Sequence, residues 1–249
     1  MPGKQLIVFD FDWSFVDQDT DRWVFEVLST ELRRLLQVRK SSGTGMQCTP
    51  DVVNDTMKDL YERGFTKDQV LDALRILPFH PAMKRAVTSL QERNAETSFL
   101  CLSNSNEIYI STILEKHGLS NLFADIITNP AHWSSDAPDH LIIGRRHPAS
   151  APPHGCTVGC LANMCKGDEL DTYLAAHGGK DSYSKIVYVG DGSNDFCPLL
   201  RMRKGDLVCV RKGLELDERI KEEGEEKGLK VDVVFWEQAW QIDEYFSKL

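Results

Sequence analysis

Five short apolar runs restrict what this chain can fold into more than any other feature of its sequence. Each is four to six residues long and rich in β-branched or aromatic residues. Apolar runs of this length are typical of strands that are buried on both faces of a parallel sheet. The runs are Leu6–Phe9, Ser98–Leu102, Ile186–Val189, Leu207–Val210 and Val231–Trp236.

Segments with helical periodicity lie between these runs. They are Ala82–Gln91, Ile108–His117, Glu169–His177 and Leu214–Lys227. Strands that alternate with helices of this length predict βαβ units, because parallel neighbours need a long crossover connection. We therefore expect an α/β fold with a parallel sheet and helices on both of its faces.

A stretch after the first run interrupts this alternation, since it contains helical patterns but no strand-like run. One helix is expected over Arg22–Leu36, followed by a polar loop at Ser41–Gly45. Thr49–Pro50 is typical of a helix start, and Thr66 has the spacing of a capping box for a further helix. The stretch therefore predicts a block of helices inserted after the first strand.

Such a block predicts a small cap over the carboxyl ends of the strands, where open α/β sheets bind ligands. The expected division is a core formed by residues 1–18 and 80–249 and a helical cap formed by residues 19–79. The proline-containing segment Asp136–Pro153 is expected to form a hairpin or an excursion near the site.

The composition excludes several classes of protein. Of the 249 residues, 41% are hydrophobic and 27% charged, which is typical of a globular protein. With 29 basic and 38 acidic residues, the net charge of −9 argues against general nucleic-acid binding. No apolar stretch approaches the roughly 18–20 residues that cross a membrane, so no membrane partner is expected. The odd number of cysteines, seven, excludes a fully paired disulfide framework within the chain and favours a cytoplasmic setting.

Two pairs of aspartates directly follow two of the predicted strands. Asp10 and Asp12 come after the first run, while Asp191 and Asp195 come after Ile186–Val189. Taken singly, each pair is explained as well by turn or helix-capping residues. Together they bring four carboxylates to one edge of a sheet, where like charges about 4 Å apart repel by roughly 4 kcal/mol. Such a cluster needs a cation, and carboxylate and carbonyl oxygens suit Mg²⁺.

Two further residues fit a phosphate site. Ser103 follows the second run just before a predicted helix, where its hydroxyl and the next backbone N–H groups can bind phosphoryl oxygens. A Ser or Asn helix cap explains that segment equally well. Lys166 precedes the helix expected from about Asp168 to His177, and a single lysine is more often a solvated surface residue. Ser103 and Lys166 are candidate phosphate-binding residues because the four carboxylates are expected beside them.

The two aspartate pairs, Ser103 and Lys166 form four motifs. Their order along the chain and their places after the predicted strands resemble the haloacid dehalogenase (HAD) superfamily of phosphatases, and the resemblance covers nearly the whole chain. More narrowly, four segments are similar to the phosphoethanolamine/phosphocholine phosphatase family. That family also contains enzymes that act on pyridoxal phosphate and thiamine monophosphate. The segments are Asp17-x-x-Thr20-Asp21-x-Trp23, His154-x-Cys156, Asn163–Lys166 and Gly190–Pro198.

The resemblance implies a role for each residue of these motifs. Asp10 is the expected nucleophile that forms an aspartyl-phosphate, and Asp12 is the expected general acid and base. Ser103 and Lys166 are expected to bind the phosphoryl oxygens. The implied Mg²⁺ ligands are Asp10, the backbone carbonyl of Asp12, and Asp191, with Asp195 as a further ligand or a carboxylate behind them.

Three positions are expected to contact the substrate. Members that act on choline or ethanolamine esters usually carry an Asp after the Ser of the second motif, where this chain has Asn104. The pair that recognises an amine would then be Asp21 and Asn104, with one formal charge instead of two. Trp13 either offers a cation–π face to an ammonium group or packs under the cap.

Several groups that could bind zinc lie within a dozen residues. They are His154, Cys156, Cys160 and Cys165. Their spacing lacks the paired C-x₂-C pattern of the usual structural zinc sites, so free, oxidation-sensitive thiols are the favoured interpretation. Cys197 and Cys209 are expected to be small buried hydrophobes.

We expect a Mg²⁺-dependent phosphomonoesterase acting on a small phosphorylated metabolite, either a phosphocholine or phosphoethanolamine type of ester or pyridoxal 5′-phosphate. A polyol or sugar phosphate phosphatase is the alternative, favoured if Asn104 marks a neutral headgroup. A receiver-like signalling module fits poorly, because its acceptor Asp follows a middle strand. A non-catalytic phosphate-binding protein would usually have lost one of the catalytic carboxylates.

Overall fold

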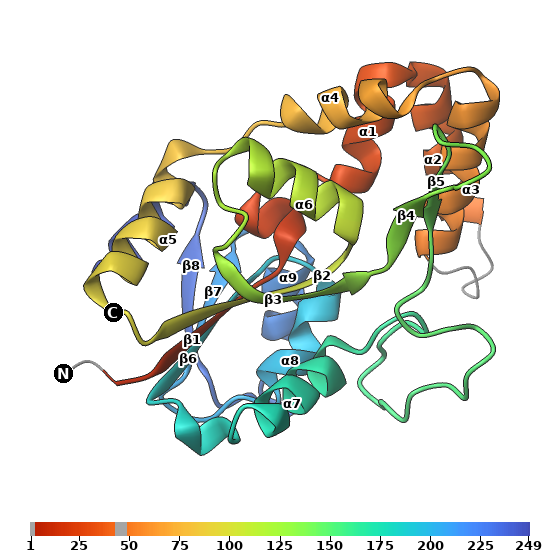
Figure 1. Cartoon of the computed structure of the whole chain (residues 1–249). Coiled ribbons are helices and arrows are strands. Elements are labelled where there is room, and N and C mark those ends of the chain that lie inside the picture. The colour runs from red at the N-terminus through yellow and green to blue at the C-terminus, as the bar shows by residue number, and fades with distance from the viewer. Residues whose placement is uncertain (1–2, 43–48) are drawn as a thin grey trace.

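Six parallel strands form the central sheet of the computed structural model, which describes residues 3–42 and 49–249 (Figure 1). The order across the sheet is β3-β2-β1-β6-β7-β8. The strands are β1 (Gln5–Phe9), β2 (Thr97–Asn106), β3 (Phe123–Asn129), β6 (Lys185–Gly190), β7 (Leu207–Arg211) and β8 (Asp232–Trp236). All five predicted runs form strands, so the predicted α/β fold is confirmed.

Alternate side chains of each strand enter two separate cores. In β1, Ile7 and Phe9 contact one core, whereas Leu6 and Val8 contact the other. The first core is covered by α5 (Pro81–Arg93), α6 (Glu107–Lys116) and α10 (Ala239–Phe246). The second core is covered by α7 (Lys166–Ala176), α8 (Phe196–Leu199) and α9 (Glu215–Glu223). Burial on both faces explains why the runs are continuously apolar.

The edge strand β3 is not among the predicted strands. In the second half of β3, the apolar or β-branched stretch is limited to the three residues Ile126–Thr128. Asp125, just before this stretch, is exposed. β3 is paired on one side only, and its exposed Ala124 and Asp125 interrupt the apolar pattern, so its sequence carries a weaker strand signal than the predicted runs do.

Four helices follow β1: α1 (Thr20–Leu28), α2 (Thr30–Ser42), α3 (Thr49–Glu62) and α4 (Lys67–Arg75). The single helix predicted over Arg22–Leu36 is wrong, because Ser29 is extended (φ −156°, ψ 101°) and separates α1 from α2. Its hydroxyl accepts the N–H of Leu32 at 3.3 Å, which caps the second helix. The start at Thr49 and the capping box at Thr66 are confirmed. Beyond Ser42, the predicted loop lies outside the described residues.

Residues 130–165 leave the sheet between β3 and α7. The short strands β4 (Ala131–Trp133) and β5 (Leu141–Ile143) form an antiparallel hairpin beside α3 (Figure 1). The N–H of Ile143 donates to the Asn54 side chain of α3 at 2.9 Å. The hairpin thus begins earlier than the predicted Asp136–Pro153 segment, and residues 144–165 continue without a helix or strand.

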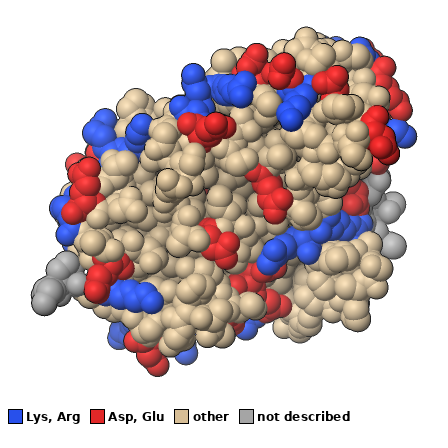
Figure 2. Space-filling view, viewed as in Figure 1, with Lys and Arg blue, Asp and Glu red and all other residues tan. Residues whose placement is uncertain are grey.

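Charged residues of both signs lie next to one another on the face of the molecule shown in Figure 2. Ion pairs link many charged side chains of the described residues, such as Arg146 with Glu169 at 2.9 Å. Within the described residues, no helix combines the length and the apolar character needed to cross a membrane.

Candidate active site

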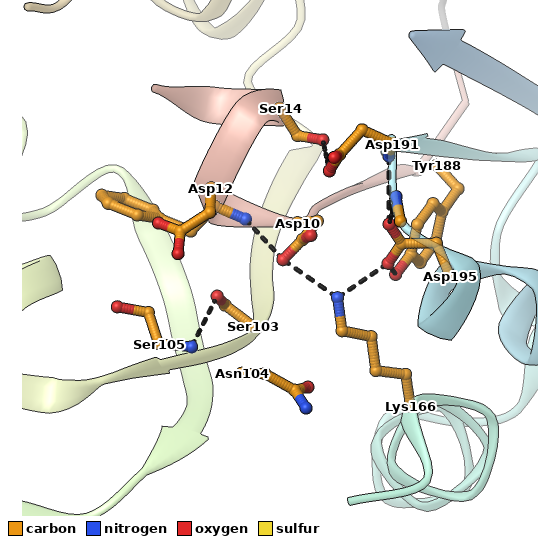
Figure 3. A network of polar contacts seen from close by, with 12 residues as sticks. Asp10, Asp12, Ser14, Ser103, Asn104, Ser105, Lys166, Tyr188, Asp191 and Asp195 are labelled. Carbon is orange, nitrogen blue, oxygen red and sulfur yellow. Dashed lines mark hydrogen bonds and ion pairs between the residues drawn. The ribbon is translucent and has the colours of Figure 1, made fainter. Parts of the chain in front are cut away.

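The register of three adjacent strands brings Asp10, Ser103 and Asp191 to one edge of the sheet. Phe9, the last residue of β1, pairs with residues of both β2 and β6. Asp10 therefore leaves the sheet between these two strands, and its N–H donates to the carbonyl of Val189 at 2.9 Å. Figure 3 shows the side chains that meet here.

Lys166 lies at the centre of this cluster. Its ammonium is 2.9 Å from Oδ1 of Asp10 and 2.7 Å from Oδ1 of Asp195 (Figure 3). Lys166 is the first residue of α7 rather than a residue before the helix, and it is fully buried. Burial by itself lowers the pKa of a lysine, but the two carboxylates outweigh burial and raise the pKa of Lys166. This lysine is therefore charged at neutral pH.

Asp195 holds Lys166 and the glycine-containing turn in place. Its Oδ1 accepts hydrogen bonds from the Lys166 ammonium and from the Tyr188 hydroxyl, both at 2.7 Å. Its Oδ2 accepts from the backbone N–H groups of Asp191 and Gly192, both at 3.0 Å. Because each oxygen already accepts two hydrogen bonds, this buried carboxylate is suited to positioning its neighbours.

The carboxylates at this edge carry an excess of negative charge. Oxygens of Asp10, Asp191 and Asp195 all lie within 4.8 Å of one another. Burial, followed by repulsion from Asp10 and Asp195, raises the pKa of Asp191 to about 8. Burial raises the pKa of Asp10 to about 6, although Lys166 opposes this shift. Three carboxylates around one ammonium leave two negative charges in excess when ionised, and their oxygen donors fit a divalent cation such as Mg²⁺.

The turn Phe11–Phe15 directs Asp12 away from Asp10. Within it Trp13 has φ 54°, the only positive φ of a non-glycine residue among those described. Its carbonyl accepts from Arg211 at 2.7 Å, which stabilises this conformation. The Asp12 carboxylate accepts from the Thr20 hydroxyl at 3.2 Å through Oδ2, while its buried Oδ1 has no hydrogen-bond partner.

Asp12 is suited to donating a proton. Burial, followed by the nearby charges of Asp19, Asp21 and Asp10, raises its pKa well above the usual range of an aspartate. A carboxyl group with a raised pKa holds its proton more firmly than an ordinary aspartate does and can then act as a general acid.

A cavity of about 500 Å³ opens beside Asp10 and is acidic on the side of the helical block. Asp19 and Asp21 line it together with Asp12, and the ammonium of Lys40 lies 3.8 Å from Asp19. Burial raises the pKa of Asp21 to about 7, with Lys40 opposing and Asp19 adding to the shift. The cavity therefore holds more negative than positive side chains next to the predicted nucleophile.

Most of the predicted site residues line this cavity. They are Asp10, Asp12, Trp13, Asp21, Ser103, Asn104 and Asp191. Lys166 and Asp195 do not line it and lie behind Asp10 instead. The Ser103 hydroxyl accepts the N–H of Ser105 at 3.1 Å, and the buried Oδ1 of Asn104 has no hydrogen-bond partner.

Sequence reasoning missed several residues that line the cavity. Asp19 precedes α1 and accepts the N–H of Arg22 at 2.9 Å, so its sequence signal is that of an ordinary helix cap. Lys40 and Arg219 come from α2 and α9, far from any of the motifs. Only the packing of these helices brings them to the site.

The cysteines are arranged differently from the prediction. His154 bonds to the carbonyl of Leu161 at 2.8 Å and is not part of the sulfur cluster. Cys197 is buried as expected, but its Sγ lies 3.6 Å from the sulfurs of both Cys156 and Cys165. Sequence reasoning did not predict this, because Cys197 lies on another element with no paired spacing.

Residues 5–249 match the protein family described as "Putative Phosphatase". The chain belongs to this family. Pyridoxal phosphate phosphatase PHOSPHO2 of Bos taurus is 28% identical over 248 residues, which cover 99% of this chain and 98% of that protein. Inorganic pyrophosphatase 2 of Arabidopsis thaliana is 34% identical over 209 residues, which cover 83% of this chain and 70% of that protein.

The fold of this phosphatase is shared with solved HAD structures. A substrate-bound phosphoserine phosphatase has a TM-score of 0.62 at 14% identity, with 98% of this chain and 99% of that chain covered. A HAD family hydrolase of Salmonella enterica has a TM-score of 0.59 at 14% identity, and the match covers 94% of this chain and 68% of that chain. The chain is a phosphatase, a phosphoric monoester hydrolase, and its fold is that of the HAD family hydrolase.

Proposed function

We propose that this phosphatase hydrolyses small phosphomonoesters with a positively charged amine headgroup, of the phosphocholine or phosphoethanolamine type. The observation that carries the proposal is the acidic lining of the cavity beside Asp10. Asp19 and Asp21 line the cavity beside Lys40, on the side where a headgroup would lie. An ammonium group placed there would replace water around buried carboxylates and balance their charge.

In the first half of the proposed reaction, a carboxylate oxygen of Asp10 attacks the phosphorus atom. Lys166 fixes the orientation of Asp10, and Ser103 donates its hydroxyl proton in a hydrogen bond to a phosphoryl oxygen. Asp12 gives its proton to the leaving alkoxide as the ester bond breaks. The products are the free alcohol and a phosphate ester on Asp10.

In the second half, Asp12 takes a proton from a water molecule, and the oxygen of this water attacks the phosphorus atom. The bond between phosphorus and Asp10 then breaks, which releases inorganic phosphate and restores the Asp10 carboxylate. Asp12 ends the cycle protonated, as it began. The helical block of residues 19–79 is the proposed cap that excludes bulk water from the cavity during these steps.

Asp10, the backbone carbonyl of Asp12, and Asp191 would hold Mg²⁺. When bound, the ion supplies positive charge that stabilises the phosphoryl group in the transition state. The Ser14 hydroxyl donates to Oδ1 of Asp191 at 3.1 Å and so orients this ligand. The four hydrogen bonds of Asp195 support a positioning role for it rather than direct binding of the ion.

Pyridoxal 5′-phosphate is a second candidate substrate. Trp13 is the one aromatic side chain among the described residues that line the cavity, and it could stack on a pyridine ring. Its ring already faces the Arg211 guanidinium at 5.4 Å, so the acidic lining is the stronger argument. Pyrophosphate fits less well, because a second phosphate group would lie against Asp19 and Asp21.

Release of phosphate from five compounds would test the proposal. They are phosphocholine, phosphoethanolamine, pyridoxal 5′-phosphate, pyrophosphate and glycerol 3-phosphate, each assayed with Mg²⁺ and with a chelator. We expect the highest kcat/KM for an amine-bearing ester and loss of activity with the chelator. Preference for glycerol 3-phosphate or pyrophosphate would overturn the proposed headgroup. Full activity after removal of Mg²⁺ would overturn the proposed metal.

A further inference from the structure

Four cysteine sulfurs meet beside α7, three from the segment that precedes this helix and one from α8. The Sγ atoms of Cys156, Cys160, Cys165 and Cys197 all lie within 4.8 Å of one another. Two of the separations are 3.6 Å, too long for a disulfide, in which the sulfurs are about 2.05 Å apart. Tetrahedral Zn²⁺ with Zn–S bonds of about 2.3 Å holds its sulfurs roughly 3.8 Å apart. We propose that these four cysteines bind a structural Zn²⁺ ion.

The surroundings of the cluster suit thiolates. Cys165 lies at the N-terminus of α7, where the helix dipole stabilises negative charge, and its Sγ accepts the N–H of Asp168 at 3.4 Å. The Sγ of Cys156 accepts the N–H of Val158, also at 3.4 Å. The Arg201 guanidinium lies beside Cys197 and offsets part of the charge of four thiolates.

The segment that carries three of these cysteines is irregular, and its polar contacts are mostly at its two ends, such as Arg146 with Glu169 at 2.9 Å. Residues 144–165 contain no helix or strand, and none of residues 144–162 is buried. Its apolar burial is small, limited to Val158 against the second core and to Met164 and Cys165 at its end, and offsets only part of the entropy of ordering the backbone. Arg219 donates to the carbonyl of Val158 at 2.5 Å, which is one restraint. A metal bound to Cys156 and Cys160 supplies a much stronger one.

Close packing around Cys197 supports a preformed metal site. A Cβ atom at Gly167, in the first turn of α7, would lie 2.6 Å from the Cys197 Sγ. Glycine at this position lets the helix pass near enough to the sulfur for Cys165 and Cys197 to share one ion.

The ion would also shape the active site, a consequence that rests on the proposed function. Gly159, Cys160 and Leu161 line the cavity, and Cys165 directly precedes Lys166. Zinc would therefore fix one wall of the cavity and the start of the helix that carries the central lysine. The zinc site itself does not depend on the substrate or on the reaction.

Metal analysis of the purified, untagged chain of 249 residues tests the site directly. We expect about one Zn²⁺ per chain, released when a mercurial reagent blocks the thiols. Replacement of the ion by Co²⁺ should give the absorption bands of a tetrahedral tetrathiolate centre. The Cys156→Ser variant should reduce the zinc content about tenfold or more. Cys209→Ala, which changes a buried cysteine of β7 outside the cluster, should retain the full zinc content.

Wild-type protein without zinc, whether with four reactive thiols or with a disulfide between two of them, would overturn the site. This result does not depend on whether Cys156→Ser folds. The Asp10→Asn variant separates the two proposals, because it should lose turnover and keep zinc. Zinc binding in a protein that does not hydrolyse amine-bearing esters would contradict the proposed function alone.

Discussion

The Nζ atom of Lys166 lies 2.7 Å from Oδ1 of Asp195, and neither side chain exposes any surface to solvent. A buried pair of this kind adds little net stability, but removal of one partner leaves an uncompensated charge. The same ammonium lies 2.9 Å from Asp10. The position of the predicted nucleophile therefore depends on a carboxylate that does not line the cavity.

Removing the charge of Lys166 should destabilise the protein as well as inactivate it. We expect Lys166→Met to lower the free energy of unfolding by about 3–5 kcal/mol, because Asp195 stays buried without its cation. In the double variant Lys166→Met/Asp195→Asn, the amide can still accept from the N–H groups of Asp191 and Gly192. We therefore expect it to recover part of the lost stability but no activity. Urea denaturation of both variants measures this coupling, and equal stability would contradict it.

Asp10→Asn should abolish turnover and leave the fold intact. We expect kcat to fall by about 10⁴-fold or more, because the amide is a poor nucleophile. Lys166 keeps Asp195 as its partner, so circular dichroism and the melting temperature should change little. Acid quenching with ³²P-labelled substrate should trap labelled protein for the wild type only. Asp136→Asn, at an exposed position of the hairpin, is the matched control.

Binding of a cationic substrate should strengthen as the pH rises through about 7. The pKa of Asp21 is raised to about 7 by burial, so this carboxylate gains its charge in that range. KM for phosphocholine should fall as the pH rises from 6 to 8, roughly as the ionised fraction of Asp21 increases. KM for a neutral ester should not follow this trend. The pH dependence of KM for phosphocholine should be lost in Asp21→Asn, and its persistence there would exclude Asp21 as its source.

The same carboxylate should make the fold less stable at high pH. Because the pKa of Asp21 is higher in the folded chain than its usual value of 3.8, ionisation favours the unfolded state. Its contribution to stability is present below about pH 4 and is lost as the pH rises through about 7. Asp21→Asn should therefore be more stable than the wild type at pH 8, by at most about 4 kcal/mol, and no more stable at pH 4. Denaturation at both pH values measures this difference.

Asn104→Asp should increase the preference for amine-bearing esters. The Asn104 side chain lines the cavity with an unpaired Oδ1, so a carboxylate there adds negative charge without breaking a described hydrogen bond. We expect kcat/KM for phosphocholine relative to glycerol 3-phosphate to rise at least about fivefold, which corresponds to roughly 1 kcal/mol. Asn104→Ser, a neutral replacement, is the control. An unchanged ratio would place the headgroup away from this residue.

The strands and the ends of strands could be predicted because local sequence determines them. Apolar runs of four to six residues have few alternatives to a buried strand, and polar residues directly after them must lie at the sheet edge. This pattern is sufficient to place Asp10, Ser103 and Asp191 at one edge of the sheet. Local sequence does not predict the extended residue Ser29, which divides an apparently continuous helical pattern into two helices. It also does not predict the edge strand β3.

The sequence by itself determined the α/β class, the order of the motifs and the acidic edge of the sheet. Only the tertiary structure decided which distant groups complete the site. Asp19 and Lys40 reach the cavity through the packing of helices, and Cys197 joins Cys156 across 41 positions of the chain. The physical reason is that strand formation follows from a few neighbouring side chains, whereas helix packing depends on contacts that no local pattern records.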